Sequence, residues 1–173
     1  ELYDECRGVG GVAGQVKGVI KNCTNIGGRV VGKKDANGNT LTGGVVGTLA
    51  PGGAQDCYNT GNVTGEGNLV GGVIGVINPS STVQDCYNTG NVTGEGDRVG
   101  GVVGYAATSS TVQDCYNTGS INGGDRTGGI VGTVANIVTK CYNTGTIISK
   151  GINGTGGTVG SCVTKIPQDI SLC

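Results

Sequence analysis

Apolar positions along the chain occur in short runs of β-branched residues, each bounded by Gly, Asn, Asp or Ser. Runs such as GGVIGV, TVQDC and GNVTG follow one another closely, and no 3.6-residue apolar stripe is sustained over ten residues. Because turn-forming residues interrupt every run, the pattern predicts about three short strands in each 28–29-residue unit and no amphipathic helix.

The units are near-identical repeats. The string QDCYNTGNVTGEG occurs at 55–67 and again at 84–96, and CYNTG returns at 115–119 and 141–145. A second motif, GG-x-x-G, recurs at spacings of 28 to 33 residues; it begins at Gly10, Gly43, Gly71, Gly100, Gly128 and Gly156. A unit this short cannot bury its own apolar face, but stacked units can.

We therefore predict an all-β fold, a parallel β-helix (β-solenoid) of about six coils with 28–29 residues per coil. Residues 1–173 form one domain, with an atypical N-terminal coil over 1–42, regular repeats over 43–155 and a C-terminal cap over 156–173. Like residues then stack about 4.8 Å apart. Three apolar columns follow: Val12, Val45, Val73, Val102, Ile130; then Ile20, Ala54, Val83, Val112, Val138; and Val63, Val92, Ile121, Ile147.

Composition narrows the function classes. Gly supplies 38 of 173 residues, which disfavours a helical bundle. The absence of His excludes catalysis by an imidazole and metal sites with His ligands. The net charge of −1 gives no indication of nucleic acid binding. No apolar run is long enough for membrane insertion as a helix.

At the level of motifs, GG-V-V/I-G followed by DCYNTGNVTG resembles the GLUG-motif repeats of exported bacterial surface and adhesin-like proteins. The resemblance runs from about Val9 to Gly160 and implies a secreted β-solenoid repeat region, extracellular or at the cell surface. It does not imply the peptidase activity found beside some such repeats, since HExxH is absent. The first unit departs from the pattern, with CTNIGGRVVG and the insertion KKDANGNT.

Eight cysteines divide into two groups. Five are expected to form a structural ladder, one per coil: Cys23, Cys57, Cys86, Cys115 and Cys141. Near the ends, Cys162 and Cys173 form the candidate disulfide, and Cys6 with Cys23 is a second possibility. Ladder cysteines follow the second apolar column by three residues, so strict alternation would put the two on opposite faces. A bend between them would turn both inward, which we favour because free Cys is usually buried.

Two further columns carry candidate chemistry. A tyrosine column forms a candidate surface stripe: Tyr58, Tyr87, Tyr116 and Tyr142. It either stiffens the rod or contacts a carbohydrate or protein; an ice-binding face receives poor support from the single Thr column beside it. The residues before the ladder cysteines include Asp56, Asp85 and Asp114, for which we weigh turn capping above calcium binding or a carboxylate pair.

These observations predict no enzyme, no cofactor and no resident metal, because residues that recur in every coil do not form one asymmetric catalytic constellation. The predicted function is a non-enzymatic extracellular rod, a repeat segment of a surface adhesin-like protein that binds a host or carbohydrate ligand. The alternative is a filament subunit that stacks head to tail with itself. Residues 163–172 would then contact the next copy; otherwise they cap their own last coil.

Overall fold

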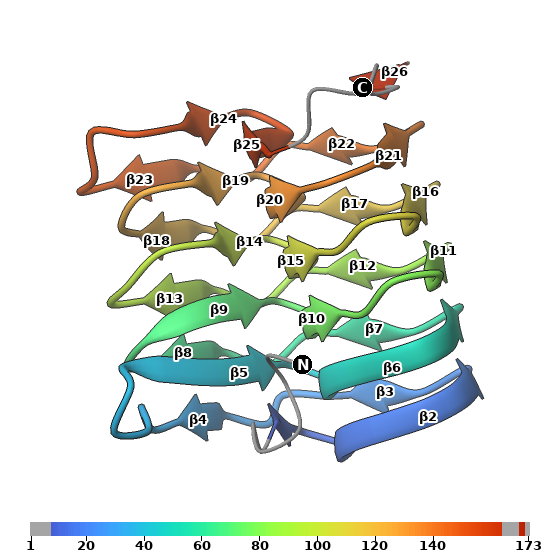
Figure 1. The fold of residues 1–173 in the computed structure, drawn as a ribbon. Helices are drawn as coiled ribbons and strands as arrows, with labels where there is room; N and C mark the ends of the chain where they lie inside the picture. The colour runs from blue at the N-terminus through green and yellow to red at the C-terminus, as the bar shows by residue number, and fades with distance from the viewer. Residues whose placement is uncertain (1–7, 164–169, 172–173) are drawn as a thin grey trace.

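A computed structural model describes residues 8–163 and 170–171, and the regular structure in these ranges consists of β-strands. Pairing between turns is parallel, as in β12 with β7 and β17, and like residues of successive repeats are partners. The turns are stacked from the N-terminal end at the bottom of Figure 1 to the C-terminal end at the top. The chain therefore forms an all-β parallel solenoid, as the repeats predict.

Each turn contributes to four sheets. Sheet A contains β1 (Val9–Gly10), β5 (Asn39–Gly43), β9 (Asn68–Gly71), β14 (Val99–Gly100), β19 (Thr127–Gly128) and β24 (Thr155–Gly156). Sheet B contains β2 (Ala13–Lys21), β6 (Val46–Gln55), β10 (Ile74–Ile77), β11 (Thr82–Gln84), β15 (Val103–Ala106), β16 (Thr111–Gln113), β20 (Val131–Val134), β21 (Ile137–Thr139), β25 (Val159–Cys162) and β26 (Ile170–Ser171).

Sheets C and D complete the turn. Sheet C contains β3 (Thr24–Asn25), β7 (Tyr58–Asn59), β12 (Tyr87–Asn88), β17 (Tyr116–Asn117) and β22 (Tyr142–Asn143). Sheet D contains β4 (Val30–Gly32), β8 (Val63–Gly65), β13 (Val92–Gly94), β18 (Ile121–Gly123) and β23 (Ile147–Ser149).

The solenoid has about five turns, slightly fewer than the six predicted from the GG-x-x-G count. Sheets C and D have five strands each, whereas sheet A has six. The sixth motif, at Gly156, begins a turn for which the described residues supply strands of sheets A and B only.

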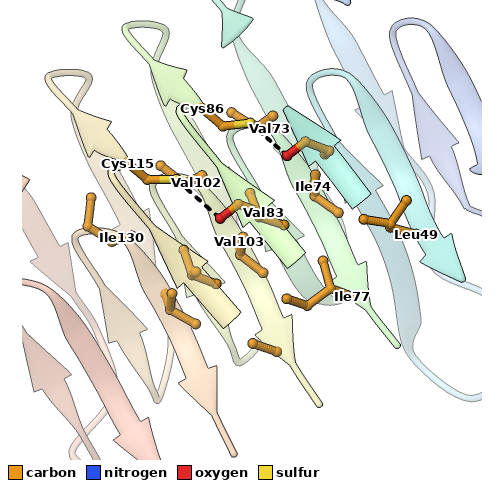
Figure 2. Close-up of a cluster of buried hydrophobic side chains, with 14 of the residues drawn as sticks. Leu49, Val73, Ile74, Ile77, Val83, Cys86, Val102, Val103, Cys115 and Ile130 are labelled. Carbon is orange, nitrogen blue, oxygen red and sulfur yellow. Dashed lines mark hydrogen bonds between the residues drawn. The ribbon is translucent and has the colours of Figure 1, made fainter. Parts of the chain in front are cut away.

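Buried apolar side chains form three clusters. The larger of the two main cores combines sheet B residues with the cysteines that precede sheet C, and the smaller joins sheets A and D through Val70, Val99 and the column Val63, Val92, Ile121. The third cluster consists of Leu41, Leu69 and Val76. Val102 is fully buried between Val73 and Ile130, as predicted (Figure 2). Its backbone is hydrogen-bonded to both residues in the adjacent turns. Small β-branched side chains fit this thin interior, which explains why Phe, Trp and Met are absent.

A sharp bend connects sheet B to sheet C. Val83 and Cys86 are both buried although they are three residues apart, because Asp85 between them has φ +52°. Asp56 and Asp114 occupy the same left-handed conformation in the neighbouring turns, with φ of 54° and 52°. Asp and Asn tolerate this region better than other non-glycine residues, so their column marks the bend.

The glycines of GG-x-x-G permit close approach between backbones. A Cβ placed on Gly72 would collide with the Gly101 carbonyl oxygen of the next turn and lie 2.8 Å from Asn88 Nδ2. A Cβ on Gly104 would lie 2.6 Å from the Gly75 oxygen and 2.8 Å from the Val70 nitrogen. The glycines of the motif therefore allow the backbones of neighbouring sheets and turns to approach closely. No helix in the described ranges has the length and apolar character needed to cross a membrane.

Candidate functional site

Along sheets C and D, eight successive residues in each turn point alternately outward and inward. In the third turn, Asn88, Gly90, Val92 and Gly94 are buried, and the residues between them are exposed or half-buried. The outward residues of this turn are Tyr87, Thr89, Asn91 and Thr93. Because successive turns pair in register, each outward residue starts a column that runs along the solenoid.

Beneath the tyrosines lies a buried ladder of asparagines, one from each turn. In each step the side-chain Nδ2 donates to Oδ1 of the asparagine in the next turn, at 2.7 Å; the members are Asn25, Asn59, Asn88, Asn117 and Asn143. The same Nδ2 atoms donate within their own turns to a glycine carbonyl, as from Asn88 to Gly90 at 2.7 Å. Both amide hydrogens are thus satisfied in the interior turns, which a buried amide requires.

The sequence analysis missed this ladder, although the chain carries a signal for it. The first unit replaces the tyrosine and threonine of CYNTG by Thr24 and Ile26 but retains Asn25 between them. A residue kept where its neighbours change points to a structural requirement. That requirement is hydrogen bonding between turns.

The predicted tyrosine stripe is a continuous stack on the outer side of sheet C. Ring centroids of Tyr58, Tyr87 and Tyr116 are 4.7 Å apart in each step, with interplanar angles of 4° and 3°. Tyr142 continues the stack at 5.3 Å. The rings cover one another's faces, so the stripe presents ring edges and phenolic hydroxyls outward.

Stacking also affects the acidity of the phenols. Packing against neighbouring rings removes water from Tyr87 and Tyr116 and raises the pKa of both. Repulsion from a phenolate at the adjacent tyrosine raises each pKa further.

The predicted cysteine ladder lies at the start of sheet C and faces the larger core. Cys57, Cys86, Cys115 and Cys141 are buried, and Cys23 in the first turn is half-buried. Each thiol contacts the carbonyl two residues before it, as from Cys115 Sγ to the Gln113 oxygen at 3.0 Å. Hydrogen bonding with the Cys141 and Cys86 thiols, together with burial, raises the pKa of Cys115 well above its ordinary value.

The six cysteines in the described ranges have free thiols, so the predicted disulfide finds no support there. Cys162 is an exposed free thiol at the end of β25. Its predicted partner Cys173, and Cys6 as the possible partner of Cys23, lie outside the described residues.

The aspartate column lies on the bend described above and faces solvent. Across the described ranges, no group of three or more Cys, Asp or Glu side chains is arranged to hold a metal ion. The left-handed backbone at the bend accounts for the column.

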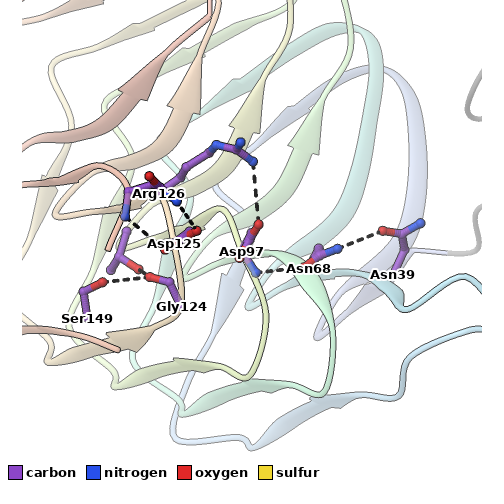
Figure 3. A network of polar contacts seen from close by, with 9 residues as sticks. Asn39, Asn68, Asp97, Gly124, Asp125, Arg126 and Ser149 are labelled. Atoms are coloured by element: carbon purple, nitrogen blue, oxygen red, sulfur yellow. Dashed lines mark hydrogen bonds and ion pairs between the residues drawn. The ribbon is translucent and has the colours of Figure 1, made fainter. Parts of the chain in front are cut away.

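A polar network lines the corner between sheets D and A (Figure 3). Asn68 donates to Asn39 Oδ1 at 3.3 Å and accepts from the Asp97 backbone N–H at 2.8 Å, and Asp97 pairs with Arg126 at 3.6 Å. One turn further, the side-chain amide and backbone N–H of Asn153 donate to Asp125, which lowers the pKa of that carboxyl. These groups join adjacent turns at the surface.

The outward side of sheets C and D is free of charge over most of its area. In turns two to five, the segments 57–65, 86–94, 115–123 and 141–149 contain no charged residue. Arg29 is the single charged residue in the corresponding segment 23–32 of the first turn. We call this surface the CD face. The groups that it presents outward are hydroxyls, amides and ring edges.

The parallel sheets, in-register side-chain ladders and repeating unit define a β-solenoid repeat protein. Residues 96–122 match the family model of the GLUG motif, which confirms the predicted resemblance for that segment. The matched segment begins before β14 and ends in β18, so the motif corresponds to about one turn of the solenoid. Neither the curated proteins nor the solved structures gave a match. Fold and motif together fit a repeat structural protein.

Proposed function

We propose that this chain is a non-enzymatic structural and interaction rod, a repeat segment of a secreted or cell-surface adhesin-like protein. The observation that carries the proposal is that interior groups of every turn contact the next turn. Asparagine amides, glycines and apolar columns in every turn contact the next turn, so the repeats build length with regular outer faces.

The absence of catalysis is part of this proposal. Side chains that recur in each turn lie in equivalent environments, whereas acid–base catalysis needs groups whose environments differ. We expect no turnover of polysaccharides or peptides. Reproducible hydrolysis that disappears when Asp85 is replaced by Asn would contradict this part.

The CD face is the proposed contact surface for a host or carbohydrate ligand. It offers a tyrosine stripe and a row of threonine hydroxyls without charge, and nothing in its chemistry favours nucleic acid or an anionic membrane. Negative-stain microscopy tests the rod. Short particles of one length are expected, and compact globular particles would contradict the proposal.

Head-to-tail stacking into a filament is the second candidate, and the ends of the asparagine ladder favour it. Asn143 in the last turn has no further asparagine to receive its second amide hydrogen, and Asn25 in the first turn has an Oδ1 that receives none from a preceding asparagine, within the ranges described. A second copy could continue this one-directional ladder, and strand edges at both ends could pair. Long uniform fibres in the same images would favour this candidate over isolated rods.

A further inference from the structure

Large apolar side chains that are well exposed lie in the first turn of the described chain and from the fifth turn onward. They are Val12, Val19, Ile26, Val31, Tyr142, Ile148, Ile152 and Val163. Some of these exposures follow from open ends, because Val12 belongs to a core column. Others do not, because their side chains point sideways from the solenoid.

Val31 and Ile148 belong to this second kind. Both lie in one outward column of sheet D, in which successive partners are Val31, Thr64, Thr93, Asn122 and Ile148. The interior members are polar, whereas Val31 is 40% exposed and Ile148 is 54% exposed. Ile26 likewise stands in the first turn where CYNTG has threonine, and Tyr142 is 52% exposed in the last turn.

The CD face is therefore uncharged in its middle and carries additional exposed apolar side chains at both ends, next to Arg29 in the first turn. We propose that this face binds a second copy of the chain in an antiparallel, two-fold-symmetric pair. A two-fold axis along the strand direction places the first turn against the partner's fifth turn and sets the third turn against itself. Val31 then meets the partner's Ile148, and this contact occurs twice.

Charge and composition favour this occupant. Burial of the CD face desolvates no charge in turns two to five, and Arg29 lies in the terminal turn, where a long side chain can reach water at the rim. Interfaces between proteins are depleted in charge at their centre and enriched in tyrosine. The carboxylates of Asp56, Asp85 and Asp114 border the face and are not covered in this arrangement.

The area of the CD face determines how strongly the two copies are expected to bind each other. Eight extended residues across and five strands at the usual spacing give a footprint of about 600 Å² per copy. The pair would bury roughly 1,200 Å², at the lower limit of stable specific interfaces. We therefore expect a concentration-dependent dimer with a dissociation constant in the micromolar range. This pairing is lateral and does not depend on the rod or filament role proposed above, but it covers the CD face, so a paired chain does not offer that face to the ligand proposed above.

Sedimentation equilibrium across the micromolar range tests the proposal on the chain and matched variants. In V31T/I148N, each apolar residue is replaced by one that its own column carries in the interior, so the turn should fold unchanged. We expect dimerisation at least about tenfold weaker, equivalent to about 1.4 kcal/mol. The control V19T adopts the residue of its own sheet B column, where Thr82 and Thr111 lie, and should dimerise like the parent.

A charge pair tests the symmetry. Thr89 lies in the third turn and meets its own copy across the proposed axis, so Thr89→Arg and Thr89→Asp should each be monomeric. An equal mixture of the two should restore the dimer, because opposite charges then face each other. A mixture that stays monomeric would overturn the antiparallel arrangement, as would a dimer unaffected by V31T/I148N.

A parent chain that stays monomeric at all concentrations would also overturn the proposal. If that monomer is retarded in gels containing the neutral polymer hydroxyethylcellulose, the occupant of the CD face is a polysaccharide and not a second copy. In either case, microscopy of the isolated particles still decides separately whether the chain is a rod.

Discussion

Asn88 Nδ2 donates a 2.7 Å hydrogen bond to Oδ1 of Asn117, a residue 29 positions later and one turn further along the solenoid. Its other amide hydrogen bonds to the Gly90 carbonyl, and its own Oδ1 accepts from Asn59. This one side chain therefore joins three turns in the buried interior. Buried amide networks stabilise a fold when every member is satisfied, and they are costly to interrupt.

Asn88→Ala is expected to destabilise the protein by about 3 kcal/mol, because the Gly90 carbonyl and Asn117 Oδ1 lose their donor in a dry interior. Urea unfolding provides the measurement. The control is Asn91→Ala on the exposed side, where the side chain accepts a single hydrogen bond from Ser120, and a loss below about 1 kcal/mol is expected. Equal losses for the two variants would argue against the ladder.

Gly72→Ala and Gly157→Ala are matched changes at the second glycine of GG-x-x-G. In the interior turn the new methyl would collide with the Gly101 carbonyl and press on Asn88, whereas at Gly157 nothing lies within 4 Å. We expect Gly72→Ala to lower the free energy of unfolding by about 1–3 kcal/mol through overpacking, and Gly157→Ala to leave it nearly unchanged. Thermal melts followed by circular dichroism distinguish them. A tolerated Gly72→Ala would mean that adjacent turns are further apart.

Val102→Asp tests the stacking of the larger core. The side chain is fully buried between Val73 and Ile130, so a carboxylate there would be desolvated without a partner at a cost of several kcal/mol. Thr118→Asp, on the exposed side of the same solenoid, serves as the control. A Val102→Asp protein with the melting temperature of its parent would show that this column is misplaced.

Stability should fall at alkaline pH as the tyrosine stack ionises. Folding raises the pKa of Tyr87 and Tyr116, so between the ordinary tyrosine pKa of 10.0 and the raised values the folded state binds more protons than the unfolded state. The stabilisation is present below pH 10 and is lost as pH rises through the raised values. Phenolate absorbance against pH, compared in folded and denatured protein, measures the shift. Titration of all six tyrosines at the ordinary value would contradict the stack.

Much of the fold follows from the repeats. Identical strings at fixed spacing place Val73, Val102 and Ile130 in one column and predict parallel stacking without further information. The burial tendency of cysteine favours a bend between Val83 and Cys86, and the structure supplies its position and cause in the left-handed backbone of Asp85. The number of turns was slightly overestimated, because a GG-x-x-G motif marks where a turn begins and not whether all four sheets are completed.

The asparagine ladder could not be obtained from hydrophobic patterning, because Asn59 and Asn88 are polar residues in buried positions. Pattern rules assign such residues to the surface. The apolar residues of the CD face were missed for a different reason. Alternation next to the core residue Ile147 already turns Ile148 outward, but the first unit departs from the repeat, so the register of sheet D is needed to place Val31 in the same outward column.

The in-register stacking of one repeat per turn is tested most directly by removing one turn. A deletion of residues 89–117 joins Asn88 to Thr118 and recreates the YNTG sequence, with all remaining columns in register. A deletion of residues 89–102 removes about half a turn and breaks every column. In thermal unfolding followed by circular dichroism, we expect the first variant to keep a β-sheet spectrum and a cooperative transition, and the second to lose both. A whole-turn deletion that fails to fold, or a half-turn deletion that melts like the parent, would contradict the solenoid register on which the account rests.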